Sequence, residues 1–259
     1  MNEQVLLPGE RLDEVNYRLR LIQKTAGLQF GTDALLLASY IKPTPNAVAV
    51  ELGGGSGIIS LLALARNKVA RVDCVEVQPA YAALIERNVR INAFEDRMRA
   101  LCCDVRDLAR QGSEQGKADI VFSNPPYMKS TSGAPNGAEE KNIARHEVLG
   151  GIFDFCAAAA RLLRYGGHFY CVYRCDRMTD LFSSLRENKL EPKRLTLVHA
   201  DVAAAPSMLL LDAVLGGKPG IKVTRPLIIS EKSAEGASAY TDDMQQVMEN
   251  GHLPQATEP

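Results

Sequence analysis

The sequence predicts an α/β fold in which helices cover both faces of a mostly parallel sheet. Short valine-rich runs at 46–52 and 70–77 alternate with helical runs at 58–67 and 79–93. This alternation is typical of parallel sheets, because each parallel strand pair needs a crossover, which is usually a helix. The last two expected strands, 193–200 and 207–217, have no long helix between them. We therefore expect an antiparallel hairpin at the end of the sheet.

The other elements follow the same order. Further strands are expected at 97–105, 117–124 and 166–174, and further helices at 146–164 and 176–188, the former delayed or kinked by two glycines. Together they predict a Rossmann-like, seven-stranded, mostly parallel sheet with a C-terminal antiparallel hairpin. We assign residues 31–230 to this domain, 1–30 to a leader that forms a β-hairpin packed on it, and 231–259 to a flexible acidic tail.

Composition is that of an ordinary globular protein. Of 259 residues, 46% are hydrophobic and 24% are charged, which argues against a disordered or coiled-coil chain. No apolar run is long enough to span a bilayer, and the first residues lack a signal-peptide pattern. The six cysteines form no CxxC pair, so we expect no metal site and reduced thiols in a cytoplasmic protein.

Charge is unevenly distributed. The net charge is −1, but the segment after residue 230 holds six acidic residues against one lysine, so the first 230 residues are mildly basic. Such a surface permits a polyanionic partner and is also explained by ordinary solvation. The residues considered for contacts with RNA phosphates are Lys189, Lys193, Arg194, Lys218, Lys222 and Arg225.

Polar motifs follow successive predicted strands. The first strand ends in Glu51 and leads through Leu52 into glycines at 53–55 and 57, a turn that lets a ligand approach the backbone closely. Glu76 ends the second strand, where a carboxylate accepts from ribose hydroxyls. Asp104 follows the third strand and is suited to accept from an adenine amino group. Together these residues predict an adenosine-bearing ligand at the C-terminal edge of the sheet.

The fourth strand ends in the run Asn124-Pro125-Pro126-Tyr127. The Asn124 side-chain carbonyl and the Pro125 main-chain carbonyl can accept both hydrogens of a planar amino group, and Tyr127 can stack on that group. The prolines stiffen the turn. This arrangement would position the weakly nucleophilic nitrogen of an adenine amino group or a glutamine amide for transfer of a methyl group.

These motifs resemble S-adenosylmethionine-dependent amino-group methyltransferases of class I. The FGTDALLLA, NPPYMK, IARHEVLGGIFDFCAAAARLLRYGG, EPKRLTLVHA and GKPGIKV stretches are similar to bacterial tRNA(Val) adenine-N6 methyltransferases of the "methyltransferase small" group, over residues 8 to 230. The resemblance implies S-adenosylmethionine as cofactor and, as substrate, the adenosine beside the anticodon of a valine tRNA.

The resemblance also assigns roles to residues. It places Gly53, Gly55 and Gly57 at the methionine end of the cofactor and Glu51 beneath its ammonium group. Thr32, in the leader motif 31–33, would close over the cofactor, and Asn124 would border both cofactor and target. In many relatives Glu51 is Asp and Gly54 is a larger residue, a difference that would loosen the turn.

Three other hypotheses stay open at the sequence level. NPPY suits the amide of a protein glutamine equally well, although only about 30 residues precede the sheet, where glutamine N5-methyltransferases usually carry a helical domain. Another nucleic acid, rRNA or DNA, would offer the same amino chemistry. A non-catalytic module that only binds the cofactor would not need the intact NPPY turn. The sequence does not indicate the oligomeric state.

Overall fold

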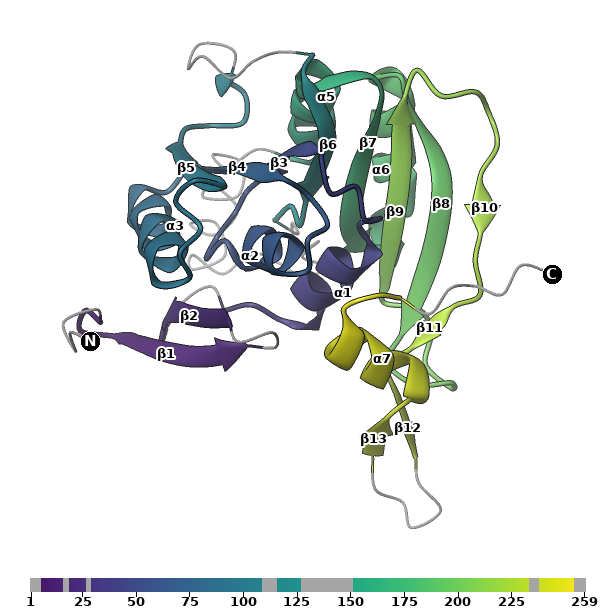
Figure 1. Ribbon diagram of the computed structural model, residues 1–259. Coiled ribbons are helices and arrows are strands. Elements are labelled where there is room, and N and C mark those ends of the chain that lie inside the picture. Colours follow the sequence, from purple (N-terminus) through teal and green to yellow (C-terminus); the bar gives the residue numbers. More distant parts are fainter. Residues whose placement is uncertain are drawn as a thin grey trace, which may run out of the picture.

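A computed structural model describes residues 6–15, 19–26, 29–108, 116–126, 151–232 and 238–253. Its centre is a twisted sheet (Figure 1) whose strands follow the spatial order β5, β4, β3, β6, β7, β9, β8, β10, with β11 also paired to β8. The bounds of these strands are β3 Val48–Leu52, β4 Arg71–Glu76, β5 Met98–Cys102, β6 Ala118–Ser123, β7 Leu163–Arg174, β8 Leu190–His199, β9 Met208–Leu215, β10 Lys222–Val223 and β11 Leu227–Ile228.

The pairing directions confirm the predicted fold class. Strands β5, β4, β3, β6 and β7 are mutually parallel, whereas β9 is antiparallel to both β7 and β8. The sheet has nine strands rather than seven, because two-residue strands β10 and β11 add to β8. These additions were missed because two residues give no detectable period.

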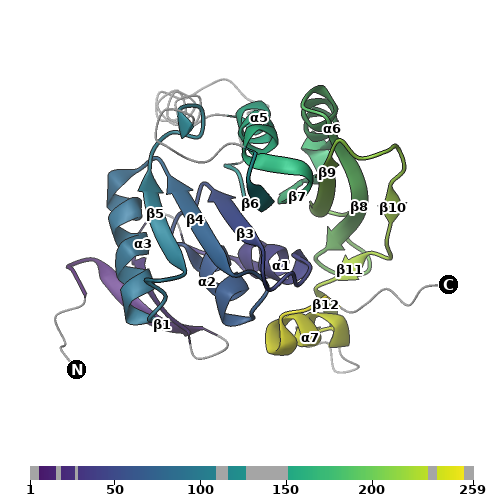
Figure 2. The same cartoon turned by 45° about the horizontal axis from the view of Figure 1, so that its top comes forward.

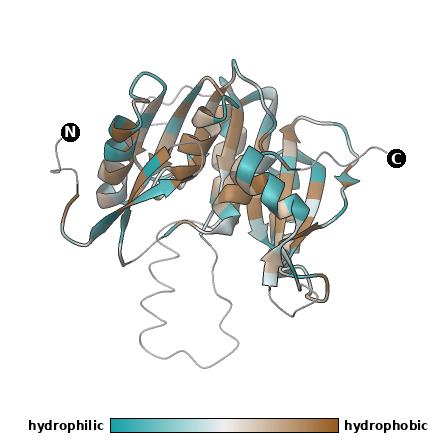
Figure 3. Cartoon of the chain, turned by 60° about the horizontal axis from the view of Figure 1, so that its bottom comes forward, coloured by the Kyte–Doolittle hydropathy of each residue, from teal (hydrophilic) through white to brown (hydrophobic). Residues whose placement is uncertain are grey.

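Helices cover both faces of the sheet (Figure 2). The apolar interior accordingly forms two main clusters. One cluster contains apolar side chains of α1, α2 and α3, and the other those of α5 and α6. Apolar residues accordingly concentrate on the central strands (Figure 3). The bounds are α1 Thr32–Tyr40, α2 Ile58–Ala65, α3 Pro79–Ile91, α5 Ile152–Leu162 and α6 Met178–Glu187, preceded by a short 3₁₀ helix, Cys175–Arg177.

The leader contains an antiparallel hairpin of β1 (Glu10–Val15) and β2 (Leu19–Lys24). Several groups on α3 hold it. Arg87 donates two hydrogen bonds of 2.7 Å to the carboxylate of Glu10. The buried amide of Asn88 accepts from the Ile22 N–H and donates to the carbonyls of Ile22 and Ser56. The hairpin is thus joined to the helix and to the loop that follows β3.

The C-terminal segment differs from the expected flexible tail. It contains the strands β12 (Ser230–Lys232) and β13 (Ser238–Tyr240) and the helix α7 (Asp242–Asn250). Met244 and Val247 of α7 are fully buried in the cluster formed by α1 and α2. Apolar residues three apart on a short helix make one buried face, and acidic residues around them concealed that signal. The segment 238–253 therefore packs on the domain.

Candidate functional site at the C-terminal edge of the sheet

Strand register brings the predicted motifs to one level of the sheet. Leu52 pairs with Val75 on one side and with Ser123 on the other. The next residues, Gly53, Glu76 and Asn124, therefore lie side by side at the C-terminal edge. Adjacent strands are about 4.8 Å apart, so this row places a glycine turn, a carboxylate and an amide within reach of one ligand.

The glycine turn is tied to the neighbouring strand. The N–H groups of Gly53 and Gly54 both donate to the Val75 carbonyl at 2.9 Å. Positive φ angles at Gly53, Gly55 and Gly57 lie in the region that favours glycine. A Cβ added at Gly55 would have no heavy atom within 4 Å, so the backbone faces open space there. A ligand can approach that part of the turn directly.

Packing in this chain leaves no room for a side chain at Gly54. A Cβ on Gly54 would overlap the Sγ of Cys74 and approach the side chain of Ile85. Cys74 is fully buried on β4, the neighbouring strand. A larger residue fits at position 54 only where the opposing residue is smaller.

Glu51 lies beneath the turn and is 1% exposed. Its Oε2 accepts hydrogen bonds from the Ser60 N–H and hydroxyl and from the Cys74 thiol. Its Oε1 is buried and has no hydrogen-bond partner among the described residues. Burial raises the pKa of Glu51 to about 7, against the opposing effect of the Ser60 hydrogen bonds. A cation close to Oε1 would compensate this burial.

The two downstream acids have different surroundings. Glu76 is 5% exposed, and its carboxylate accepts from the N–H groups of Gly55 and Gln78 at 2.9 and 2.8 Å. Asp104 is bound by Arg106 through both the guanidinium and the main-chain N–H. The Arg106 hydrogen bonds lower the pKa of Asp104. The glycine turn therefore fixes the carboxylate of Glu76. A ligand that binds Asp104 would meet a carboxylate already hydrogen-bonded to Arg106.

The turn after β6 holds the predicted catalytic run. Pro125 is buried and Pro126 half-buried, and the Ser123 hydroxyl before them donates to the Leu52 carbonyl at 2.7 Å. The Asn124 side-chain Nδ2 donates to Oδ2 of Asp33 at 2.8 Å. Tyr127 lies outside the described residues. The structure thus places Asn124, Pro125 and Pro126 at the edge where the glycine turn and Glu76 also lie.

The start of α1, just after the leader, also lies at this edge. Thr32 is the first residue of α1 and is half-buried, and the helix begins after Gly31, whose backbone is extended. Sequence reasoning assigned Thr32 to the cofactor but gave Asp33 no separate role. The contact of Asp33 with Asn124 joins residues 91 positions apart, so no local pattern could reveal it.

Most of the basic residues considered for RNA lie elsewhere. β8 runs parallel to β6 and β7, because both β7 and β8 are antiparallel to β9. Residues at the start of β8 therefore lie at the edge opposite Asn124. There Lys193 donates to the carbonyls of Lys218 and Gly220, and Arg194 lies 3.8 Å from the Tyr40 ring centroid. These two side chains make contacts within the fold and do not lie beside the turn after β6.

Within the described ranges, no group of three or more His, Cys, Asp or Glu side chains could hold a metal ion. The same part of the chain contains no helix long and apolar enough to cross a membrane.

The fold is that of the class I methyltransferases. A "predicted O-methyltransferase, protein Atu636", from Agrobacterium tumefaciens has a similar structure, with a TM-score of 0.69 at 20% identity over 86% of this chain and 98% of that one. TYW2 of M. jannaschii, crystallised in complex with AdoMet, has a TM-score of 0.56 at 14% identity, covering 80% and 86% of the two chains.

Sequence comparisons identify more specific relatives. A tRNA1(Val) (adenine(37)-N6)-methyltransferase of Flavobacteriaceae bacterium (strain 3519-10) is 26% identical over 78% of this chain and 83% of its own. A protein of the same name from Porphyromonas gingivalis is 28% identical over 75% and 78%. The family model "Conserved hypothetical protein 95" matches residues 36–149, which include the glycine turn and NPPY. The resemblance inferred from the motifs is confirmed.

Proposed function

We propose that this protein is an S-adenosylmethionine-dependent methyltransferase that modifies the N6 amino group of an adenosine in tRNA. Its substrate is the adenosine beside the anticodon of tRNA(Val), as the names of its relatives indicate for those proteins. The observation that carries the proposal is the common level of Gly53, Glu76 and Asn124 at the C-terminal edge. There the glycine turn proposed for the cofactor lies next to Asn124, whose side-chain carbonyl can accept a hydrogen bond from the target amino group.

The residues present fit the cofactor. The buried Oε1 of Glu51, which has no hydrogen-bond partner among the described residues, suits an ammonium group. The open space above Gly55 admits a ligand against the backbone. Glu76 retains acceptor capacity for ribose hydroxyls, with Asp104 beyond it and Thr32 at the leader side. When bound, S-adenosylmethionine supplies an electrophilic methyl group.

The Asn124-Pro125-Pro126-Tyr127 turn would hold the acceptor. The Oδ1 of Asn124 and the main-chain carbonyl of Pro125 accept the two amino hydrogens, which withdraws the nitrogen lone pair from the ring and aims it. Pro125 has no N–H that could compete. Tyr127 stacks on the base, which must first leave the RNA stack to reach the edge. No strong base is needed, because the methylated nitrogen loses a proton to water.

The test is transfer of radiolabelled methyl groups into unmodified total tRNA, with a protein extract as a parallel acceptor. We expect N6-methyladenosine in the tRNA by nucleoside mass spectrometry, and mapping of the label to tRNA(Val). Asn124→Ala should lower transfer roughly 100-fold. The exposed Asn46→Ala serves as the matched control and should retain full activity.

Each other result has a definite meaning. Label found only in protein glutamine would replace the proposed acceptor with a protein. Label in rRNA or DNA and none in tRNA would move the substrate to that nucleic acid. Cofactor binding without transfer to any of these acceptors would favour the binding-module hypothesis. Full activity of Asn124→Ala would refute the assigned chemistry of the NPPY turn.

A further inference from the structure

Asp33 makes a hydrogen bond to the side chain that we place at the acceptor. Its Oδ2 accepts from Nδ2 of Asn124 at 2.8 Å, and both side chains are partly buried. Asp33 lies in the first turn of α1, whereas Asn124 follows the central strand β6. The contact therefore joins the start of α1 to the turn after β6.

A carboxylate opposite a carboxamide selects one of its two flipped states. An ionised carboxylate only accepts hydrogen bonds, so it can bind the amide nitrogen and not the carbonyl oxygen. In the flipped state, the Asn124 carbonyl would face a carboxylate oxygen, and both groups would lose a charge-assisted hydrogen bond. Asp33 thus determines which edge of the Asn124 amide carries the acceptor oxygen.

The Asp33 carboxylate is itself held on its other side. Its Oδ1 accepts from the Ala34 N–H at 2.9 Å. A Cβ on Gly31 would lie only 2.8 Å from this oxygen, so the absence of a side chain at position 31 leaves room for the carboxylate. The backbone of Gly31 is extended, which any residue can adopt. A side chain at position 31 would therefore displace the Asp33 carboxylate from this place.

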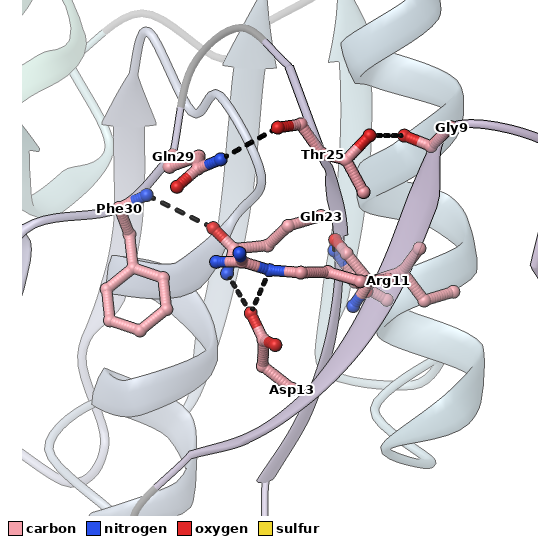
Figure 4. Close-up of polar contacts among 9 residues, drawn as sticks. Gly9, Arg11, Asp13, Gln23, Thr25, Gln29 and Phe30 are labelled. Carbon is pink, nitrogen blue, oxygen red and sulfur yellow. Dashed lines mark hydrogen bonds and ion pairs between the residues drawn. The ribbon is translucent and has the colours of Figure 1, made fainter.

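A polar network fixes the chain that leads into α1 (Figure 4). The buried Gln23 of β2 donates to Asp13 of β1 and accepts from the Phe30 N–H at 3.1 Å. Thr25 joins Gly9, before β1, to Gln29, before α1. Its hydroxyl donates to the Gly9 carbonyl, and its main-chain carbonyl accepts from the Gln29 side chain. These contacts tie the segment before Asp33 to the hairpin.

We propose that Asp33 is a positioning residue for methyl transfer. It holds the Asn124 carboxamide with its carbonyl oriented to accept a hydrogen of the target amino group. The leader hairpin supports Asp33 through the Gln23 network. This inference rests on the proposed function, and its first measurement needs no acceptor.

That measurement is hydrogen exchange of the Asn124 side-chain amide by NMR in the full chain, with the resonance assigned by its loss in Asn124→Ala. In Asp33→Asn and Asp33→Ala we expect exchange about tenfold faster, the factor that a charge-assisted hydrogen bond supplies. Asp242→Asn is the control, since Asp242 is also in the first turn of a helix but is exposed. Unchanged exchange in both Asp33 variants would overturn the proposal.

The second measurement is single-turnover methyl transfer with the acceptor that the wild-type protein labels. We expect Asp33→Asn to slow transfer roughly 10- to 100-fold, with cofactor Kd and Tm unchanged. Gly31→Ala, which leaves the carboxylate in the sequence but displaces it, should slow transfer in the same direction. In an Asn124→Ala background, Asp33→Asn should have no further effect.

Two results would contradict positioning. One is a lower cofactor affinity at an unchanged transfer rate, which would make Asp33 a cofactor residue. The other is a full additional loss in the Asn124→Ala background, which would show that Asp33 acts independently of Asn124. A wild-type protein that labels only protein would refute the tRNA acceptor, and the same variants would then be compared on that protein.

Discussion

At the scale of single residues, Gly54 and Cys74 share one small volume beneath the glycine turn. We expect Gly54→Ala to lower the free energy of unfolding by about 1 to 3 kcal/mol, because the added methyl overlaps the Cys74 thiol. Cys74→Ala should restore part of this loss, since it removes the opposing sulfur. Denaturant unfolding of both single variants and the double variant measures the coupling.

Gly151→Ala is the matched control for this cycle. Gly151 precedes α5 with an extended backbone, and a Cβ there meets nothing within 4 Å. Gly151 is the N-cap of α5, where glycine is preferred over alanine, so its variant should lose no more than about 1 kcal/mol, and this loss should add to that of Cys74→Ala. Strictly additive effects of Gly54→Ala and Cys74→Ala would contradict the shared volume.

Glu51 predicts a pH dependence of stability. Burial of the carboxylate raises its pKa from the ordinary 4.5 to about 7 in the folded protein. Between pH 4.5 and pH 7, Glu51 is protonated more often in the folded state than in the unfolded state. The contribution of Glu51 to stability is therefore present below pH 4.5 and is lost as pH rises through 7.

Relative to Glu51→Gln, the wild-type protein should lose about 2 to 3 kcal/mol of stability between pH 5 and pH 8. Unfolding in urea at several pH values, without cofactor, measures this difference. Glu95→Gln is the control, because Glu95 is exposed and its replacement should leave the pH profile unchanged. A constant difference between wild type and Glu51→Gln would contradict the buried, shifted carboxylate.

At the scale of elements, α1 depends on a lysine from outside the helix. Lys68 is fully buried, and its Nζ donates 2.8 Å hydrogen bonds to the carbonyls of Ala38, Ser39 and Ile41 at the end of α1. These carbonyls have no N–H of a following turn to accept from, so the lysine replaces that turn.

Lys68→Met should therefore lower the free energy of unfolding by about 3 kcal/mol, because buried carbonyls lose their donor. The exposed Lys218→Met is the control and should stay within about 0.5 kcal/mol of wild type. Thermal and chemical unfolding both report the loss. A stable Lys68→Met protein would mean that water satisfies these carbonyls.

At the scale of the whole molecule, the C-terminal helix closes the core. α7 buries Met244 and Val247 against α1, and the carbonyl of Gly251 after it accepts from Arg66 at 3.3 Å. Met244→Ala should lower the unfolding free energy by about 2 to 5 kcal/mol through the cavity it leaves. Gln246→Ala, on the exposed side of the same helix, should have little effect. Equal Tm values for these two variants would show that α7 does not contribute to the folded core.

The parts of the fold and of the candidate site that could be predicted are those that depend on residues close together in the sequence. The parallel sheet, its final hairpin and the strand-end motifs follow from short-range patterns of apolar residues, glycines and prolines. Each motif lies directly after its strand, so parallel register alone brings Gly53, Glu76 and Asn124 to one edge. The sequence indicated a short helical turn at 241–249, but the packing of α7 on the domain was missed because only Met244 and Val247 of this helix are fully buried.

The sequence by itself determined the class of fold, the glycine turn after β3 and the proline turn after β6, because backbone preference and hydrophobic period act within a few residues. Tertiary structure alone decided which groups meet across long separations. It placed Cys74 under Gly54, directed Lys193 and Arg194 into the fold, and set the carboxylate of Asp33 against the amide of Asn124. Such contacts depend on packing of distant elements, where volume and hydrogen-bond geometry act and local sequence carries no record of the partner.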